Sequence, residues 1–282
     1  MTYNKHTCPI DHPGLRRDFI GSSDAVAIMG VSPWDTPFSL WETKLGLRQG
    51  KDLTTAMIRG IENEDIARKY VEELYDIKLP AARVFSEKHS FLMANFDGLS
   101  SRKKVGIEIK CPGKDDHSLA EKGLVPDKYY PQLQHLMMVG ELSEIHYVSY
   151  KDNEVFIVLV KANEEYQKEL FQKEKQFYEN IVNFTEPEKT DRDYVKRNDI
   201  AWRNLAQRYV YLKGVFDQYD QELTEVRQAL IYEAKGNSSE GSGIKIIKSN
   251  RKGNVDYAKI PELKEIDLEQ YRKPSIETWR II

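Results

Sequence analysis

The pattern of apolar and polar positions in the first two thirds of the chain predicts five helices, over residues 25–29, 39–45, 54–75, 129–139 and 163–184. In residues 54–75 the apolar side chains recur at the spacing of an amphipathic helix. Gly30 follows the first helix and Pro131 stands in the first turn of the fourth, as expected for a helix end and a helix start. The helix over residues 54–75 is expected to bury one apolar stripe.

Short apolar or alternating runs between these helices predict β-strands. The predicted strands are Ala82–Phe85, Phe91–Phe96, Lys104–Ile109, Ile145–Tyr150 and Val155–Val160. Residues 99–103 are expected to form the turn between the second and third strands. The order of helices and strands predicts an α/β fold, a mixed sheet flanked by helices, over about residues 15–185.

The last third of the chain has a different pattern. Its apolar residues follow one another at alternating spacings of 3 and 4, namely Trp202, Leu205, Tyr209, Leu212, Phe216, Tyr219, Leu223, Val226 and Leu230. This pattern predicts a long helix that packs against another helix, either the one over residues 163–184 or one of another protein. A flexible Gly/Ser connector over residues 236–243 and a basic-tipped hairpin over residues 244–258 are expected to follow. We therefore expect a core of residues 1–189 and a C-terminal extension of residues 190–282, with a long helix and a β-hairpin.

Composition excludes several classes of protein. The chain has 282 residues, of which 40% are hydrophobic, so it can build a core and is not wholly disordered. Its 42 basic and 45 acidic residues give a net charge of −3, which neither favours nor excludes nucleic acid. The cysteines, Cys8 and Cys111, are too few for a four-cysteine zinc or iron–sulfur site. No apolar run approaches the ~20 residues of a membrane span and no signal-peptide core is present, so we expect a soluble intracellular protein.

The first candidate for chemistry is the segment Gly106–Lys110. Side chains on a strand alternate between its faces, so Glu108 and Lys110 point to one side and the isoleucines between and before them to the other. Glu-x-Lys also occurs at residues 42–44, 233–235 and 262–264, and by itself the pattern is more typical of a surface ion pair.

Asp97 separates this segment from the other three. It ends the apolar run before the turn, so it is expected to lie beside Glu108 on a neighbouring strand. Two converging carboxylates repel each other unless a cation lies between them, and their oxygens favour Mg²⁺, with Mn²⁺ as a substitute. Lys110 is then placed to position an attacking water whose pKa the metal lowers. The sequence therefore predicts a metal-dependent hydrolytic site.

The pattern Asp97…Glu108-Ile109-Lys110 resembles that of the PD-(D/E)xK nucleases, which have a restriction-endonuclease-like core. Flanking motifs resemble one branch, the phage lambda exonuclease and YqaJ-type viral recombinase family. These motifs are Gly21-Ser22-Ser23-Asp24-Ala25, Arg59-Gly60-Ile61-Glu62-Asn63-Glu64, Glu108-Ile109-Lys110-Cys111-Pro112 and Tyr129-Tyr130-Pro131-Gln132-Leu133-Gln134. They occur in the order of the family. Phe96 departs from it, since a proline usually precedes the aspartate.

The resemblance implies a role for each matching residue. Asp97 and Glu108 would be metal ligands together with the backbone carbonyl of Ile109, and Lys110 would be the catalytic lysine. Glu64 would be a helical acid that holds metal directly or through water, and Gln132 would orient the lysine or the water. Without the resemblance, Glu64 is better explained as part of a solvated helix face, and Gln132, in a first helical turn, as a surface or capping residue.

Ser22, Ser23 and Arg16 are candidates for binding a phosphate. Serine hydroxyls, free amides at a helix start and a guanidinium can all donate to an anion. The alternative is that the serines only cap the helix, and the residues alone do not decide between the two. In the family that the chain resembles, a serine and an upstream arginine contact the 5′-phosphate of DNA.

The expected function is that of a Mg²⁺-dependent exonuclease, which digests linear double-stranded DNA from 5′ ends and leaves 3′ single strands for phage-type recombination. One alternative is an endonuclease or nickase of the same fold, and another is a non-catalytic DNA-binding scaffold protein. The resemblance also implies a homo-oligomer, as a ring-shaped trimer, and a single-strand annealing protein as partner. We expect a cytoplasmic location in a bacterial host and a phage or prophage origin, with no membrane association.

Overall fold

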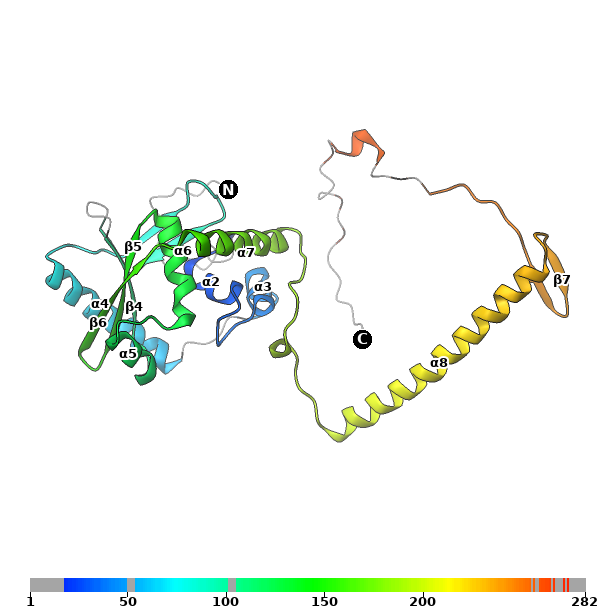
Figure 1. Ribbon diagram of the computed structural model, residues 1–282, viewed down its shortest axis with the longest axis horizontal. Coiled ribbons are helices and arrows are strands. Elements are labelled where there is room, and N and C mark those ends of the chain that lie inside the picture. The colour runs from blue at the N-terminus through cyan, green and yellow to red at the C-terminus, as the bar shows by residue number, and fades with distance from the viewer. Residues whose placement is uncertain are drawn as a thin grey trace. The chain divides into compact units, whose positions relative to one another are not determined.

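The computed structural model describes residues 18–49, 54–100 and 105–254, with a few more residues beyond 255 (Figure 1). The chain divides into two units, Met1–Lys196 and Arg197–Ile282. The first unit extends past the predicted boundary at residue 189 because the 3₁₀ turn η2, Asp191–Asp193, is attached to the loop before the second helix of the unit. Arg192 donates hydrogen bonds of 2.8 and 2.9 Å to the carbonyls of Ser32 and Pro33, and the Thr36 hydroxyl donates to the carboxylate of Asp193.

Helices and strands of the first unit follow the predicted order, with two additions. Its helices are α2 (Ser22–Ile28), α3 (Pro37–Leu45), α4 (Thr55–Tyr75), α5 (Lys114–Glu121), α6 (Tyr130–Gly140) and α7 (Glu164–Val182), and the 3₁₀ turn η1 covers Asp127–Tyr129. Its strands are β1 (Ala82–Phe85), β2 (Met93–Phe96), β3 (Gly98–Ser100), β4 (Val105–Lys110), β5 (Glu144–Lys151) and β6 (Glu154–Lys161). Neither α5 nor β3 is predicted from the sequence. Both are short, and β3 takes up part of the predicted turn.

The strands form a mixed sheet, as predicted. Its order is β3-β4-β5-β6, in which β4 and β5 are parallel and the other pairs antiparallel, and β1 and β2 pair as a separate antiparallel ribbon. The turn between β5 and β6 is formed by Asp152 and Asn153, which both have positive φ, as the tight turns of hairpins require. The parallel pair is joined through α5 and α6, because parallel neighbours need a crossover connection.

Two layers of apolar side chains cover the two faces of the sheet. On one face, Ile107 and Ile109 of β4 pack with Ala67 and Val71 of α4. On the other face, a larger core surrounds Tyr147 of β5 and is built from α2, α3, α6 and α7 together with β2. Helices α4 and α6 therefore lie on opposite sides of β4 and β5 (Figure 1). Glu108 and Lys110 alternate with the two isoleucines and belong to the α6 side.

The predicted apolar stripe of α4 is only partly correct. Among the side chains of this helix that the structure describes, those of Ala67 and Val71 are buried, whereas Ile61 and Ile66 are 61% and 52% exposed. The small Ala67 allows the helix to lie close to the sheet, and the larger apolar residues lie outside that contact. Periodicity alone therefore identified the helix but not the face that it buries.

A buried ionic contact joins α6, α7 and β2. His135 and Glu174 are both fully buried, and Nδ1 of the imidazole lies 2.6 Å from Oε1 of the carboxylate. Nε2 of the same ring lies 2.9 Å from the carbonyl oxygen of Met93. An ionised carboxylate and a carbonyl both accept hydrogen bonds, and the doubly protonated imidazolium donates one to each. Burial lowers the pKa of His135, but Glu174 outweighs this effect and the net pKa is raised.

The second unit contains the predicted long helix, α8 (Ile200–Glu233), and no residue of this helix is buried. The predicted hairpin is wrong in position. Strands β7 (Ser239–Gly241) and β8 (Ile244–Ile246) pair across Ser242 and Gly243, which both have positive φ. The predicted connector thus supplies the first strand and the turn, whereas the basic residues 249–253 lie outside both strands. Among the described helices, none combines the length and the hydropathy that crossing a membrane requires.

Candidate active site

The switch from β2 to β3 brings Asp97 against β4. Gly98 pairs with Ile107, and continuing this antiparallel register by one residue places Asp97 opposite Glu108. A hydrogen bond of 2.7 Å from the amide of Ile109 to Oδ2 of Asp97 fixes the carboxylate there. Gly98 permits this approach, because a Cβ at that position would lie 2.8 Å from the Ile107 side chain.

Glu108 lies at the centre of the site and is 2% exposed. Its Oε1 accepts one hydrogen bond of 2.6 Å from Nζ of Lys110 and another of 2.6 Å from Nε2 of Gln132, at the start of α6. Its other oxygen, Oε2, is buried without a hydrogen-bond partner in the described part of the chain. A buried carboxylate oxygen without a partner is costly, so it marks a position where a cation would be stabilised.

Arg68 of α4 connects Glu64, one helical turn before it, to the site. Arg68 donates to the Glu64 carboxylate at 2.6 Å and to the carbonyl oxygen of Asp97 at 2.6 Å. It also contacts the exposed Asp65 at 2.7 Å. The sequence analysis did not select Arg68, although its spacing of four residues from Glu64 is the spacing at which helical ion pairs form.

The acidic groups of the site raise one another's pKa. Burial raises the pKa of Asp97 to about 7, and the carboxylate of Glu108 adds to this effect. Burial and the neighbouring Glu64 raise the pKa of Glu108 against the opposing effect of Lys110, and burial and Asp97 raise that of Glu64. Burial lowers the pKa of Lys110, but Glu108 and Asp97 outweigh it and the net pKa is raised, so the side chain is an ammonium. The site therefore concentrates negative charge that one lysine and one arginine offset only in part.

The donor set fits a hard divalent cation. In the described residues, no group of three His, Cys, Asp or Glu side chains could hold a metal ion by itself. A site here would therefore combine the carboxylates of Asp97 and Glu108 with main-chain oxygen and water, a composition typical of Mg²⁺. The amide of Ile109 faces Asp97, and in a strand the carbonyl of a residue faces the same neighbour as its amide. The Ile109 carbonyl thus lies on the side where the predicted metal position requires it.

The phosphate candidates are only partly within the described residues. Arg16 lies outside them. Ser22 and Ser23 form the first turn of α2, and the N-cap is Gly21, so neither serine is the cap. Ser22 is buried and Ser23 is exposed, so only Ser23 can present its hydroxyl to a ligand. The carboxylate of Asp24, paired with Lys44 at 2.5 Å, accepts the hydrogen bond from the Gly21 amide.

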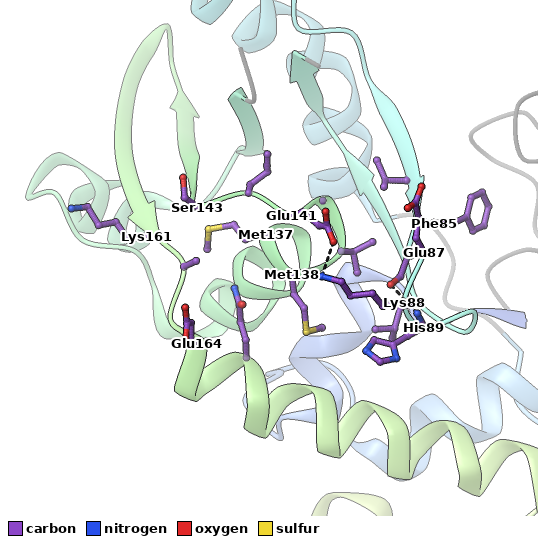
Figure 2. Close-up of a pocket in the computed structure, with 18 residues that line it drawn as sticks. Phe85, Glu87, Lys88, His89, Met137, Met138, Glu141, Ser143, Lys161 and Glu164 are labelled. Carbon is purple, nitrogen blue, oxygen red and sulfur yellow. Dashed lines mark hydrogen bonds and ion pairs between the residues drawn. The ribbon is translucent and has the colours of Figure 1, made fainter. Parts of the chain in front are cut away.

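A cavity of about 890 Å³ lies apart from these residues (Figure 2). It is formed by the end of β1 and the turn that follows it, the end of α6 and the start of α7, and none of the predicted site residues that the structure describes lines it. Lys88 and Glu141 form an ion pair of 2.7 Å at its rim, and both side chains are largely exposed. The candidate chemistry is thus at the edge of the sheet and not in this cavity.

Comparison with known proteins supports the resemblance drawn from the motifs. Residues 11–143 match the model of the YqaJ-like viral recombinase domain, and this part of the chain is similar to that domain. All the residues gathered around Glu108 lie within the matched segment. The YqaJ protein of Bacillus subtilis, itself uncharacterized, is 30% identical over 158 residues, which are 55% of this chain and 47% of that protein. The chain thus spans about half the length of this relative.

Solved structures confirm the predicted fold class of the first unit. An alkaline exonuclease from Laribacter hongkongensis matches with a TM-score of 0.53 and 21% identity, over 60% of this chain and 91% of that one. The same exonuclease in complex with dAMP matches with a TM-score of 0.53 and 21% identity, over 61% and 92% of the two chains. At this level of identity the similarity concerns the fold, a mixed sheet flanked by helices.

Proposed function

We propose that the protein is a metal-dependent DNA nuclease that hydrolyses phosphodiester bonds at the site around Glu108. The observation that carries the proposal is the grouping of Asp97, Glu108 and Lys110, with an unpartnered buried oxygen on Glu108. The match of residues 11–143 to the recombinase domain and the fold shared with an alkaline exonuclease support the same reaction class. A structural ion pair would not require a second carboxylate beside it.

Mg²⁺ is the proposed cofactor, and Mn²⁺ the proposed substitute. Asp97, Glu108 and the carbonyl of Ile109 would hold it, and Glu64 would contribute directly or through water. When bound, the ion supplies Lewis-acid stabilisation of the charge that develops on the phosphate.

The side chains around the proposed metal position have separable tasks. The ammonium of Lys110 orients the attacking water and offsets negative charge, while Gln132 holds Glu108 from the α6 side through the same oxygen, Oε1. Arg68 holds Glu64 and the main chain at Asp97. Glu108 is thus held by a donor of its own strand and one of α6, and Glu64 by a donor of its own helix.

The proposed substrate is linear double-stranded DNA, digested from 5′ ends to leave 3′ single strands for recombination. What supports this finer assignment is the recombinase domain, in which such products are expected, and the exposed Ser23 at the start of α2. A homo-oligomer, in the form of a ring trimer, and a single-strand annealing partner belong to the same proposal.

The test compares three forms of one duplex, with and without Mg²⁺: linear with 5′-phosphates, linear with 5′-hydroxyls, and covalently closed circular. We expect Mg²⁺-dependent loss of the linear forms and survival of the circle. Cleavage of the circle would identify an endonuclease or nickase, and binding without cleavage would identify a scaffold protein.

Variants of the full chain assign the reaction to the site. Lys110→Ala should abolish cleavage while the protein still binds DNA. Glu233→Ala, which removes the acid of another Glu-x-Lys pair, is the matched control and should digest DNA at the parent rate. If Lys110→Ala digests linear DNA as fast as the parent, the catalytic assignment is wrong.

A further inference from the structure

Helix α8 carries an apolar surface that nothing in the described part of the chain covers. The α8 stripe is defined here as the nine apolar positions from Trp202 to Leu230 at alternating spacings of 3 and 4. Within it, Leu205 is 68% exposed and Leu223 is 66% exposed. A continuous row of this kind, nearly the full length of a 34-residue helix, is too extended for scattered surface residues and marks an interaction site.

Helix α7, the partner within the chain that the sequence suggested, uses its apolar side chains elsewhere. Helix α7 has its own apolar positions, Leu170 and Phe177, buried in the core. It packs there against α3 and α6. The intramolecular alternative left open by the sequence would require α7 to leave this core, so we look for a partner outside the chain.

The spacing of the stripe specifies what that partner is. A hydrophobic repeat of 3.5 residues, kept without interruption, turns a straight helix into one strand of a left-handed coiled coil. Such a seam fits another helix with the same repeat, because each apolar side chain enters a hole between four residues of the facing seam. Among the described helices, α8 alone carries this repeat over its length, so a second α8 is a fitting partner.

Charges beside the stripe decide the direction of the two helices. In a parallel pair, Arg208 would face Lys213 of the second copy, a repulsive contact, while Glu222 would face Arg227. In an antiparallel pair centred between residues 217 and 218, Lys213 faces Asp220 of the second copy, twice by symmetry, and no like charges meet. In the single helix Lys213 pairs with Asp217, one turn later on the same flank of α8.

The same antiparallel register aligns the apolar positions over the full stripe. Leu212 faces Leu223 of the second copy, Phe216 faces Tyr219, and Leu205 faces Leu230, so that eight of the nine positions meet an apolar residue. Trp202 is the exception and lies beside Glu233 at the end of the helix. We propose that α8 is a self-association helix, which joins two copies of the chain as an antiparallel coiled coil through the α8 stripe. This proposal is independent of the nuclease activity.

Disulfide mapping on the full-length protein tests both the contact and its direction. Leu212→Cys and Leu223→Cys chains are purified separately and oxidised mildly, alone and after mixing. The antiparallel register predicts a covalent dimer in the mixture and only background in either chain alone, because like positions lie 11 residues apart along the pair, ~16 Å at 1.5 Å per residue. The parent, with Cys8 and Cys111, gives the background, and Tyr211→Cys mixed with Leu223→Cys is the control off the stripe.

Each result has a definite meaning. Dimers that form in each single-cysteine chain alone would overturn the antiparallel arrangement and indicate a parallel one. No dimer above background in any sample would overturn self-association through α8 and assign the stripe to a different protein. Sedimentation gives a second readout, since Leu212→Asp with Leu223→Asp should lower the particle mass and the off-stripe pair Val210→Asp with Tyr211→Asp should not. An unchanged mass in the stripe variant would also contradict the proposal.

Discussion

Arg68 donates a hydrogen bond of 2.6 Å from Nε to the carbonyl oxygen of Asp97 and so joins helix α4 to the point where β2 passes into β3. Through Nη2 the same guanidinium holds Glu64 at 2.6 Å. One side chain thus sets the position of two acids that lie 33 residues apart in sequence. Only arginine, with a planar fork of donors, can make both contacts at once.

The first prediction concerns this arginine as a positioning residue. Arg68→Ala should lower the rate of DNA digestion by about ten- to a hundredfold, which corresponds to the ~1.5–3 kcal/mol of a hydrogen bond to a charged group. Arg68→Lys should recover only part of the rate, since one ammonium cannot span both acceptors. The Mg²⁺ concentration for half-maximal activity should rise, which distinguishes positioning of the acids from a loss of fold. Lys69→Ala, next to it on the exposed side of α4, is the control, and an equal effect there would refute the role of Arg68.

A second prediction separates two glutamines on α6. Gln132 contacts Glu108, whereas Gln134 is tied to the start of α7 through the carbonyl of Lys161 and the amide of Asn163. Gln132→Leu should reduce kcat by about ten- to a hundredfold and leave the melting temperature nearly unchanged. Gln134→Leu should lower the melting temperature and leave kcat of the folded protein unchanged. The opposite pattern would exchange their roles.

Much of this site could be predicted from the sequence because its central part is local. The period of a strand places Glu108 and Lys110 on one face. Asp97 lies opposite Glu108 as expected, although it is brought there by the pairing of β3 with β4, since β2 belongs to the separate ribbon. What could not be predicted depends on packing between distant segments. The face that α4 buries is set by the closeness of Ala67 to the sheet, and the contact of Arg68 with Asp97 depends on how that helix lies. Neither the buried face of α4 nor the contact of Arg68 with Asp97 produces a periodic pattern in the sequence.

The hairpin was misplaced for a different reason. Ser242-Gly243 can adopt positive φ at both turn positions, and Glu240 and Lys245 form an ion pair of 3.0 Å across the strands. A Gly/Ser-rich composition is shared by flexible connectors and by tight turns, so composition alone does not separate them.

A third prediction concerns the buried contact of His135 with Glu174. The imidazolium is stabilised in the folded protein, so its pKa lies above the ordinary value near 6.5. The native state therefore binds the proton more tightly than the unfolded chain. The stabilisation is fully present below pH 6.5 and is lost as the pH rises through the raised pKa, at up to about 1.4 kcal/mol per pH unit.

Urea unfolding between pH 6 and pH 9 measures this effect. The free energy of unfolding should fall more steeply with pH in the parent than in Glu174→Gln, which lacks the charge that holds the proton. Glu174→Gln should also be less stable at pH 6, because it lacks the carboxylate that stabilises the imidazolium and the buried ring must give up its proton. His89→Gln, at a ring packed on Phe171, controls for the loss of a histidine. Parallel pH profiles in parent and Glu174→Gln would show that the ring is neutral in the native state.

The last prediction tests how a DNA end is distinguished from internal backbone. The chemical difference is the additional charge of a terminal phosphate monoester, which favours recognition by a guanidinium and a hydroxyl. The exposed Ser23 and the upstream Arg16 are the proposed pair. Ser22 is buried, so it can stabilise the first turn of α2 but cannot reach a ligand. Arg16→Ala and Ser23→Ala should slow digestion of 5′-phosphorylated duplex, by about ten- to a hundredfold for the arginine, and should affect a 5′-hydroxyl duplex much less. Ser22→Ala should change the melting temperature and leave the ratio of the two rates unaltered. The ratio of the two digestion rates is the quantity to measure, because a mutation that slows digestion of both duplexes equally acts on folding or on general DNA binding. Equal digestion of both duplexes by the parent would exclude recognition of the 5′-phosphate altogether.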